Sequence, residues 1–201
     1  MVTMTTLVII LAVVVVVAAG AFLVFGRKNG GHGLRRRFGP EYERVVARHD
    51  GDTKAAELEL NERLKRHGSL DERALTPEER ERYLARWAQV QDRFVDSPQQ
   101  AVAEADTLLA ELARDMGFPD GKDFDEQSDA LSVHHAKHVH GYRRVHAAKR
   151  GEGDTEQLRT ALVEARGLFD VLVSNGSDRP VPRDKHAHTD KHHHTEGSGT
   201  A

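Results

Sequence analysis

The hydrophobic pattern of the chain starts with one unbroken apolar run, from Leu7 to Phe25, that contains no charged side chain. As a helix this run would be roughly 28 Å long, close to the ~30 Å hydrocarbon thickness of a bilayer. The Val13–Val17 block is expected to be helical too, because a lone strand in lipid leaves its backbone groups unpaired. The run therefore predicts a transmembrane anchor over residues 1–26.

A cleaved signal peptide is the alternative interpretation of the same run. Ala19-Gly20-Ala21 has the small residues of a cleavage site. However, Met1–Thr6 lacks the Lys or Arg that a signal peptide carries at its start, and Phe22–Phe25 continues the apolar run past the cleavage point. We therefore expect the anchor to be retained.

Beyond the anchor the pattern becomes polar and then weakly amphipathic. Five glycines in Gly26–Gly39 predict a flexible basic linker over residues 27–39. Pro40 is suited to the first position of a helix, and Asp50-Gly51-Asp52 is expected to interrupt the helical segment that follows it. The apolar positions of these helices form only a thin stripe: Tyr42, Val45, Val46, Leu58, Leu60 and Leu64. Residues 40–75 are thus predicted to be a charged helical stalk or a loosely docked helix pair.

A better-specified helix starts at Thr76. Thr76 as N-cap, Pro77 at the first position and Glu79 at the third form a predicted capping box. The helix then has apolar residues three or four positions apart, at Tyr83, Leu84, Trp87, Val90, Phe94 and Val95. This spacing predicts one buried face.

The next helix is expected to follow after a very short connection. Ser97 is the predicted N-cap, with Pro98 first and Gln100 third, and Gly117 followed by Pro119 predicts its end. Its apolar face comprises Val102, Ala105, Leu108, Leu109, Leu112 and Met116. Because the connection is short, the two helices are expected to form an antiparallel hairpin.

Weaker patterns follow this hairpin. They predict a short helix over Phe124–Leu131 and a helix over His135–Lys149, whose inner positions are Val139, Tyr142, Val145 and His146. After a break at Gly151–Gly153, Asp154 or Thr155 is expected to cap a last helix. That helix has a continuous apolar face of Leu158, Leu162, Ala165, Phe169, Leu172 and Val173.

The predicted fold class is all-α. An N-terminal transmembrane helix is followed by a helical hairpin that belongs to a three- to four-helix bundle over residues 76–173. From residue 174 onward Gly, Ser, Pro, Asp and His dominate, which predicts a disordered His-rich tail over 174–201.

Charge separates along the chain in a way that suggests an orientation. Five positive charges and no acid follow the anchor, at Arg27, Lys28, Arg35, Arg36 and Arg37. The positive-inside rule then places the C-terminal part in the cytoplasm and the N-terminus outside a plasma membrane. The same arginines attract anionic lipid headgroups at about 1 kcal/mol per charge. The alternative is that they only set the topology.

The remainder of the chain has the opposite sign. Residues 40–180 contain 21 Lys and Arg against 29 Asp and Glu, a net charge of −8. An acidic domain is repelled by phosphate backbones, so no nucleic-acid partner is expected. We expect the lipid bilayer and an unidentified protein as partners.

Histidines are the most prominent candidates for chemistry. His134, His138 and His146 are predicted to share one helical stripe, with His135 and His140 nearby, and an i, i+4 pair of histidines can hold zinc. The tail adds five more: His186, His188, His192, His193 and His194. A metal site normally needs three or four ligands, and the chain has no cysteine and no HExxH motif. Solvated or partly packed histidines are therefore the alternative to a metal site.

Several segments of the helical region have a familiar composition: RYLARWAQVQDRFVDSPQQAVAEADTLL, DFDEQSDALSV, HGYRRVH and TEQLRTALVEARGLFDVLV. With them the chain resembles a family of small actinobacterial single-pass membrane proteins of unknown function, over about residues 39–173. The resemblance implies a membrane-anchored helical protein and brings no catalytic residues. His134-His135-Ala136 departs from the family pattern, where an acidic residue, a histidine and a proline are expected. The start of the next helix is therefore left open.

No nucleophile with an adjacent base, phosphate-binding glycine loop or paired catalytic carboxylates can be recognised. We therefore expect no enzyme and no cofactor. The preferred hypothesis is a membrane-anchored helical interaction or scaffolding protein. The alternative is a metal-handling protein that uses the bundle histidines or the tail.

Overall fold

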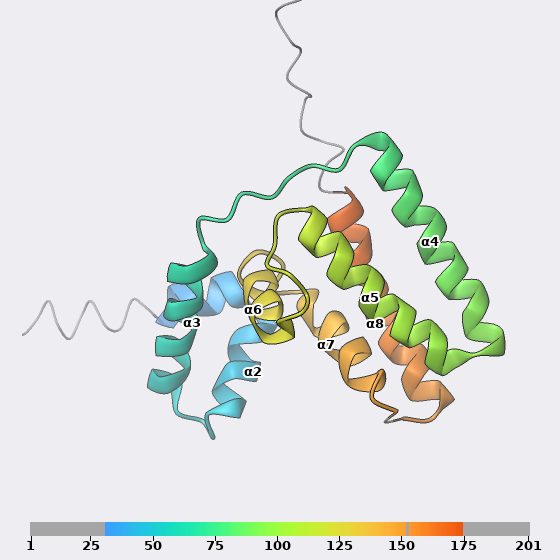
Figure 1. Ribbon diagram of the computed structural model, residues 1–201. Helices are drawn as coiled ribbons and strands as arrows, with labels where there is room; N and C mark the ends of the chain where they lie inside the picture. The colour runs from blue at the N-terminus through green and yellow to red at the C-terminus, as the bar shows by residue number, and fades with distance from the viewer. Residues whose placement is uncertain (1–30, 152, 175–201) are drawn as a thin grey trace, which may run out of the picture.

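Every regular element in the computed structural model is a helix, and the structure describes residues 31–151 and 153–174 (Figure 1). The elements are α2 (Pro40–Arg48), α3 (Thr53–His67), α4 (Pro77–Asp96), α5 (Pro98–Asp115), α6 (Phe124–His134), α7 (Val139–Ala148) and α8 (Thr155–Ser174). Residues 31–38 form a further helix ahead of α2. The predicted all-α class is confirmed for these residues.

The helices form two groups that meet at α6 and α7 (Figure 1). α2 and α3 lie on one side, and α4, α5 and α8 lie on the other. An extended connection over residues 69–76 joins α3 to α4. The predicted helical bundle is thus present, with a second set of packed helices attached to it.

α4, α5, α7 and α8 enclose the larger core. Its centre includes Trp87, which stacks on Phe169 of α8 with ring centroids 4.5 Å apart. The predicted inner faces of α5 and α8 are buried throughout. α7 and α8 cross closely at Gly141, where a Cβ atom would lie 2.3 Å from the Glu164 carbonyl oxygen. Burial of these apolar side chains is the main contribution that holds the four helices together.

The starts of α4, α5 and α8 follow the predicted signals, with one difference at α5. Thr76 and Glu79 form the expected capping box at α4. Ser97 is the N-cap of α5, but its side chain accepts no capping hydrogen bond. At α8, Asp154 accepts a hydrogen bond from the Gln157 N–H at 2.9 Å. Pro98 at the first position thus starts α5 without help from a side-chain cap.

The prediction of a flexible linker over residues 27–39 is wrong for residues 31–38, the part that the structure describes as a helix. Residues 31–38 are helical, and Leu34 and Phe38 are buried, because they are four positions apart and face the same side. Gly39 ends this helix at a φ of +49° and allows the chain to turn into α2. The glycines of this segment therefore do not prevent a docked helix.

The predicted stalk is also a packed unit. A cluster of buried apolar side chains, here named the N-terminal cluster, contains Leu34, Phe38, Tyr42, Val45, Ala56, Leu60 and Val133. Val133 comes from α6, whose Ala130 and Leu131 belong to the bundle core. The two cores thus share α6, and α2 and α3 are neither solvated nor loosely attached.

Three apolar positions of the predicted stripes are exposed. Leu58 on α3 is 65% exposed, and Leu84 and Val95 on α4 are 37% and 83% exposed. Leu84 and Val95 flank the buried face of α4, so the spacing overestimated the width of that stripe. Leu58 lies on the face of α3 opposite to Ala56 and Leu60.

α7 starts later than the predicted helix over His135–Lys149. His135 to His138 form a turn, in which the His138 N–H donates to the His135 carbonyl oxygen at 2.9 Å. α7 then begins at Val139 with His138 as N-cap. His134 and His138 therefore belong to different helix ends and not to one stripe.

No helix among residues 31–151 and 153–174 is long and apolar enough to cross a membrane. The predicted anchor over 1–26 and the predicted tail from residue 175 onward lie outside the described residues. Both stay predictions. Ser174, the first residue of the predicted tail, ends α8.

Candidate functional site: a buried ion-pair network

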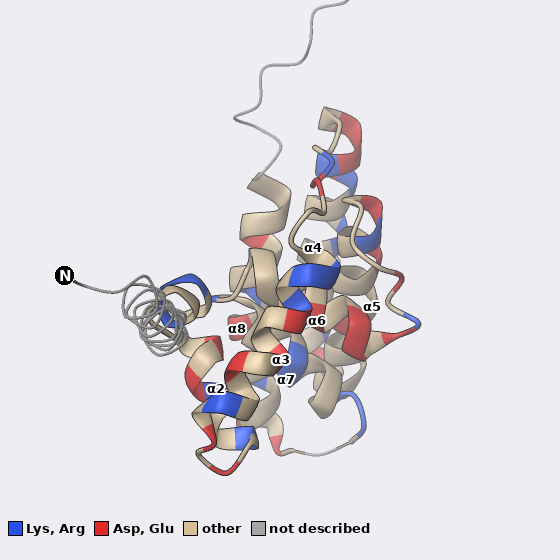
Figure 2. Cartoon of the chain, turned by 90° about the vertical axis from the view of Figure 1, so that its left-hand side faces the viewer, with Lys and Arg blue, Asp and Glu red and all other residues tan. Residues whose placement is uncertain are grey.

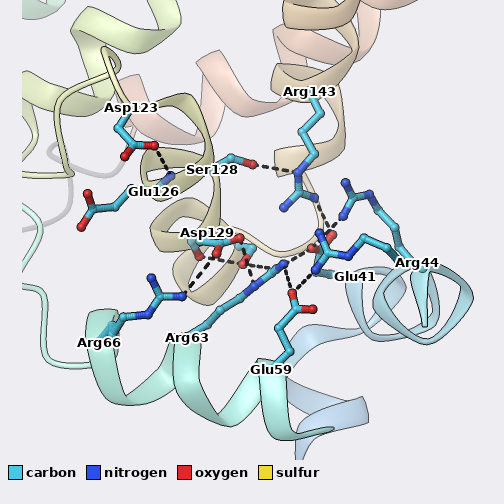
Figure 3. A network of polar contacts seen from close by, with 12 residues as sticks. Glu41, Arg44, Glu59, Arg63, Arg66, Asp123, Glu126, Ser128, Asp129 and Arg143 are labelled. Atoms are coloured by element: carbon cyan, nitrogen blue, oxygen red, sulfur yellow. Dashed lines mark hydrogen bonds and ion pairs between the residues drawn. The ribbon is translucent and has the colours of Figure 1, made fainter. Parts of the chain in front are cut away.

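The most unusual polar feature of the molecule lies where α2, α3, α6 and α7 meet (Figure 2). Its centre is Glu41, in the first turn of α2, with a side chain only 2% exposed. Oε1 of Glu41 accepts a hydrogen bond from Arg63 Nη1 at 2.9 Å, and Oε2 accepts one from Arg143 Nη1 at 2.6 Å. Arg44 Nη1 lies 3.5 Å from Oε1. The carboxylate of Glu41 thus connects α2 to α3 and α7 (Figure 3).

Arg63 is the second centre of this network. Its side chain is 1% exposed and lies on α3, one turn after Leu60. Besides Glu41, Arg63 donates to Ser132 Oγ at 3.1 Å and to Glu59. Its Nε lies 3.0 Å from Asp129 Oδ1, at ion-pair distance but without the alignment of a hydrogen bond. Arg63 therefore joins α3 to both α2 and α6.

Arg143 completes the connection on the α7 side. Its Nε donates to Ser128 Oγ on α6 at 2.7 Å, while Nη1 reaches Glu41. Figure 3 shows the two guanidinium groups approaching Glu41 from different helices. Every charge at the centre thus has an opposite charge within hydrogen-bond reach, which buried ions require.

Glu59 lies at the outer edge of the network. Burial would raise the pKa of its carboxyl, but hydrogen bonds from His49 and Arg48 and the charge of Arg63 lower that pKa to about 2. His49 Nε2 is 2.7 Å from Glu59 Oε2. Glu59 is therefore ionised at neutral pH and offsets part of the positive charge of the arginines.

This network connects helices. Its donors and acceptors point at one another (Figure 3). A buried set of charges is costly to break and fixes one arrangement of the elements that carry it. Its effect is to hold α2 and α3 in one orientation against the bundle.

The network was not found from the sequence, although one signal was present. Ala56, Leu60, Arg63 and His67 follow one another at helical spacing and are all buried. A charged residue in the middle of an apolar stripe indicates a buried ion that needs partners. Glu41 gave no such signal, since a carboxylate in the first turn of a helix is common at exposed sites.

The predicted lipid-surface arginines fall partly within the structure. Arg35, Arg36 and Arg37 lie on the helix over residues 31–38 and are exposed, while Leu34 and Phe38 hold that helix in place. Arg35 pairs with Glu43 of α2 at 2.7 Å. Arg27 and Lys28 lie outside the described residues.

The candidate metal ligands in the bundle do not converge. His134 is at the end of α6, where its Nε2 lies 2.8 Å from the His67 carbonyl oxygen. His146 is in α7, with Nδ1 3.0 Å from Asp106 Oδ1 and its ring stacked on Phe124. His138 precedes α7 and makes neither contact. The three rings therefore serve separate local contacts.

Within residues 31–151 and 153–174, no group of three or more His, Asp or Glu side chains is placed to hold a metal ion. The tail histidines His186, His188, His192, His193 and His194 lie outside this part of the chain. Metal binding by the tail stays a prediction.

Asp106 anchors a second, smaller polar cluster. Its side chain is 5% exposed and accepts a hydrogen bond from Lys149 Nζ at 2.9 Å in addition to the His146 contact. Tyr142, which lies on α7 with His146, donates a hydrogen bond to Gln127 at 2.7 Å, and burial raises the pKa of the Tyr142 hydroxyl. These contacts bind α7 to α5 and α6, so the cluster has a packing role.

Comparisons with known proteins give no match: no family model matches the chain, and no curated protein or solved structure is significantly similar to it. The resemblance to actinobacterial membrane proteins that was drawn from the sequence therefore stays a prediction.

Proposed function

We propose that the protein is a membrane-anchored interaction module, which presents its helical bundle to a protein partner at the cytoplasmic face of the plasma membrane. The observation that carries the proposal is the rigid attachment of the basic helix over residues 31–38. That helix follows the predicted anchor within a few residues and packs on α2 and α3 through Leu34 and Phe38. A flexible linker would leave the bundle free to tumble, whereas a docked helix sets its orientation.

The charges of this helix support contact with a lipid surface. Arg35, Arg36 and Arg37 are exposed on it, and each basic side chain near an anionic membrane contributes about 1 kcal/mol. The acidic remainder of the chain is repelled by the same surface. The molecule thus has one end suited to the membrane and one suited to the aqueous side.

The buried network extends this orientation to the bundle. Glu41 follows the basic helix directly and is paired with Arg63 of α3 and Arg143 of α7. The membrane-side helix and the bundle are therefore expected to move as one body. Such a body suits a scaffold, because a partner bound to the bundle is held at a defined distance from the bilayer.

The absence of cysteine allows a direct test of the anchoring and the orientation. Single cysteines are introduced in the full chain as Thr3→Cys and Val95→Cys, the second at a side chain that is 83% exposed. A membrane-impermeant maleimide should label the first variant on intact cells and the second only after permeabilisation. Labelling of Val95→Cys on intact cells, or recovery of a shortened protein from the medium, would overturn this orientation.

The interaction role is tested by site-specific photo-crosslinking in cells. A photoreactive amino acid is placed at Leu84, Val95 or Val163, which are exposed on α4 and α8, and at Leu58 on α3 as a comparison. We expect neighbouring bundle positions to give a protein adduct of the same mass. A charge substitution beside those positions should abolish that adduct. Adducts that are absent from every bundle position would reject the scaffold.

A further inference from the structure

The geometry points to a small anion-binding pocket beside the basic helix, suited to a phosphate group of a lipid headgroup or of a free phosphate. The pocket has a volume of about 260 Å³ and lies between residue 37, the turn before α7, and α8. Its lining contains one arginine, one lysine and three histidines: Arg37, Lys137, His134, His135 and His138. Ligands of drug size need about 300–1,000 Å³, so the pocket favours a small group.

The charged side chains that line this pocket are basic. Among the described residues the lining contains Arg37 and Lys137 and no carboxylate. Glu72 lies behind the histidines, with Oε1 3.6 Å from His134 Nδ1 and 3.2 Å from His135 Nε2. It therefore faces the two histidine rings and is not part of the lining.

A buried ring nitrogen in the same lining lacks a hydrogen bond. The His135 side chain is 6% exposed, and its Nε2 makes no hydrogen bond, although Glu72 is within ion-pair distance. Because Glu72 Oε1 lies 3.2 Å from this nitrogen, the ring faces a carboxylate behind the pocket, and the side chains left for an anion are Arg37, Lys137 and His138.

The start of α7 contributes the His138 ring to this pocket. His138 is the N-cap of the helix, and no side chain caps it. The backbone satisfies most of the first N–H groups, because the Val139 N–H donates to the His135 carbonyl oxygen at 3.0 Å and the Gly141 N–H to the His138 carbonyl oxygen at 3.1 Å. The contacts that the pocket offers to an anion are therefore side-chain contacts.

The electrostatics of His138 agree with this arrangement. Burial lowers the pKa of its ring, and the charges of His135, His140 and Lys137 lower it further. No carboxylate counteracts these charges. An anion in the pocket would raise the pKa of this ring, and this gives the site a measurable signature.

If the protein is membrane-anchored as proposed above, a lipid headgroup is the nearest source of a phosphate group. The binding of phosphate by the pocket does not itself depend on that proposal. Arg37 belongs to the helix that carries Arg35 and Arg36. If that helix lies on an anionic membrane, headgroup phosphates are the anions nearest to the pocket.

The first arm of the test uses the full chain in neutral detergent micelles with inorganic phosphate as the probe. Modification of His138 by diethylpyrocarbonate is followed by mass spectrometry at constant ionic strength, with chloride as the reference anion. Protection should follow 1 + [phosphate]/Kd, which is about tenfold at ten times Kd. His140, which lies outside the pocket and is 51% exposed, serves as the internal control. Equal protection of His138 and His140 would overturn the pocket.

Variants separate the pocket from diffuse attraction to the basic helix. Arg37→Ala and Lys137→Ala should abolish the protection of His138, whereas Arg36→Ala should retain it, since Arg36 is a neighbour outside the lining. All three side chains are exposed, so the variants are expected to fold, which circular dichroism checks. If Arg36→Ala and Arg37→Ala behave alike, the attraction is diffuse and the pocket is rejected.

The second arm distinguishes the two sources of phosphate. The full chain is placed in nanodiscs of phosphatidylcholine alone or with added phosphatidic acid, in buffer without phosphate. Protection of His138 by phosphatidic acid, lost in Arg37→Ala, supports the headgroup. Protection by inorganic phosphate alone rejects the headgroup and keeps the pocket. Failure of the cysteine-labelling test would reject the membrane setting and leave the micelle result unaffected.

Discussion

Glu41 and Arg63 are 22 positions apart in the sequence, yet their side chains form an ion pair of 2.9 Å in which both are almost fully buried. Because Glu41 also binds Arg143 of α7, the pair belongs to a network that joins the N-terminal helices to the bundle. The stability of this junction is therefore the property most open to test.

The first prediction concerns the loss of the central charge. Glu41→Gln keeps the size of the side chain but leaves Arg63 and Arg143 without their shared carboxylate, and breaking a buried pair typically costs about 3–5 kcal/mol. Urea unfolding of the full chain in micelles, followed by circular dichroism, should give a loss of this size. The control is Glu43→Gln on the same helix, whose pair with Arg35 is exposed and should be worth less than about 1 kcal/mol. Equal losses would show that the network does not stabilise the junction.

The second prediction concerns pH. The pKa of Glu59 is lowered from 4.5 to about 2 in the folded state, so its contribution to stability is full above pH 4.5 and is lost as pH falls toward 2. Between pH 5 and pH 3 the free energy of unfolding should therefore fall less in Glu59→Gln than in the natural chain. Glu62→Gln is the comparison, because the Glu62 side chain is exposed and pairs with the exposed Lys65. If the free energy of unfolding falls equally in Glu59→Gln and in the natural chain, the lowered pKa of Glu59 is contradicted.

The third prediction uses one substitution at two glycines. In Gly141→Ala the new Cβ would meet the backbone of Glu164 at 2.3 Å, so α7 and α8 must separate, at a typical cost of about 1–3 kcal/mol. In Gly33→Ala nothing lies within 4 Å, and alanine should stabilise the helix by roughly 0.5–1 kcal/mol. Thermal unfolding should thus shift in opposite directions. Stabilisation by Gly141→Ala would contradict the close crossing.

The fourth prediction compares two helix starts with the same sequence logic. Thr76→Ala removes a formed capping box and should cost about 1 kcal/mol, whereas Ser97→Ala removes a side chain that caps nothing and should cost only a few tenths. Both positions precede a proline, so the context is matched. Equal costs for the two variants in urea unfolding would be evidence that Ser97 caps α5 in solution.

Sequence reasoning succeeded where the signal is local. The starts of α4 and α5 and the apolar faces of α5 and α8 follow from residues within one helix, and the structure confirms them. Helical periodicity and N-terminal signals act over a few residues and do not depend on distant parts of the chain. The same reasoning failed at Val95, because spacing alone does not say how wide the buried face is.

Sequence reasoning failed where the partner is distant. Leu34 and Phe38 gave too little apolar signal to outweigh the glycines around them, and their burial depends on α2 and α3. Arg63 was not identified as a buried charge, because its partners on α2 and α6 could not be known from its own helix. His134 and His138 were placed on one stripe, since the turn between them has no strong breaker.

The separation of the network along the chain has a consequence for synthesis on the ribosome. Arg143 is 102 positions after Glu41, and translation at about 5–20 residues per second adds it roughly 5–20 seconds later. During that interval Glu41 and Arg63 must stay hydrated, because α6 and α7 have not yet been made. The earliest of the described helices to leave the ribosome are therefore expected to be among the last to reach their final packing.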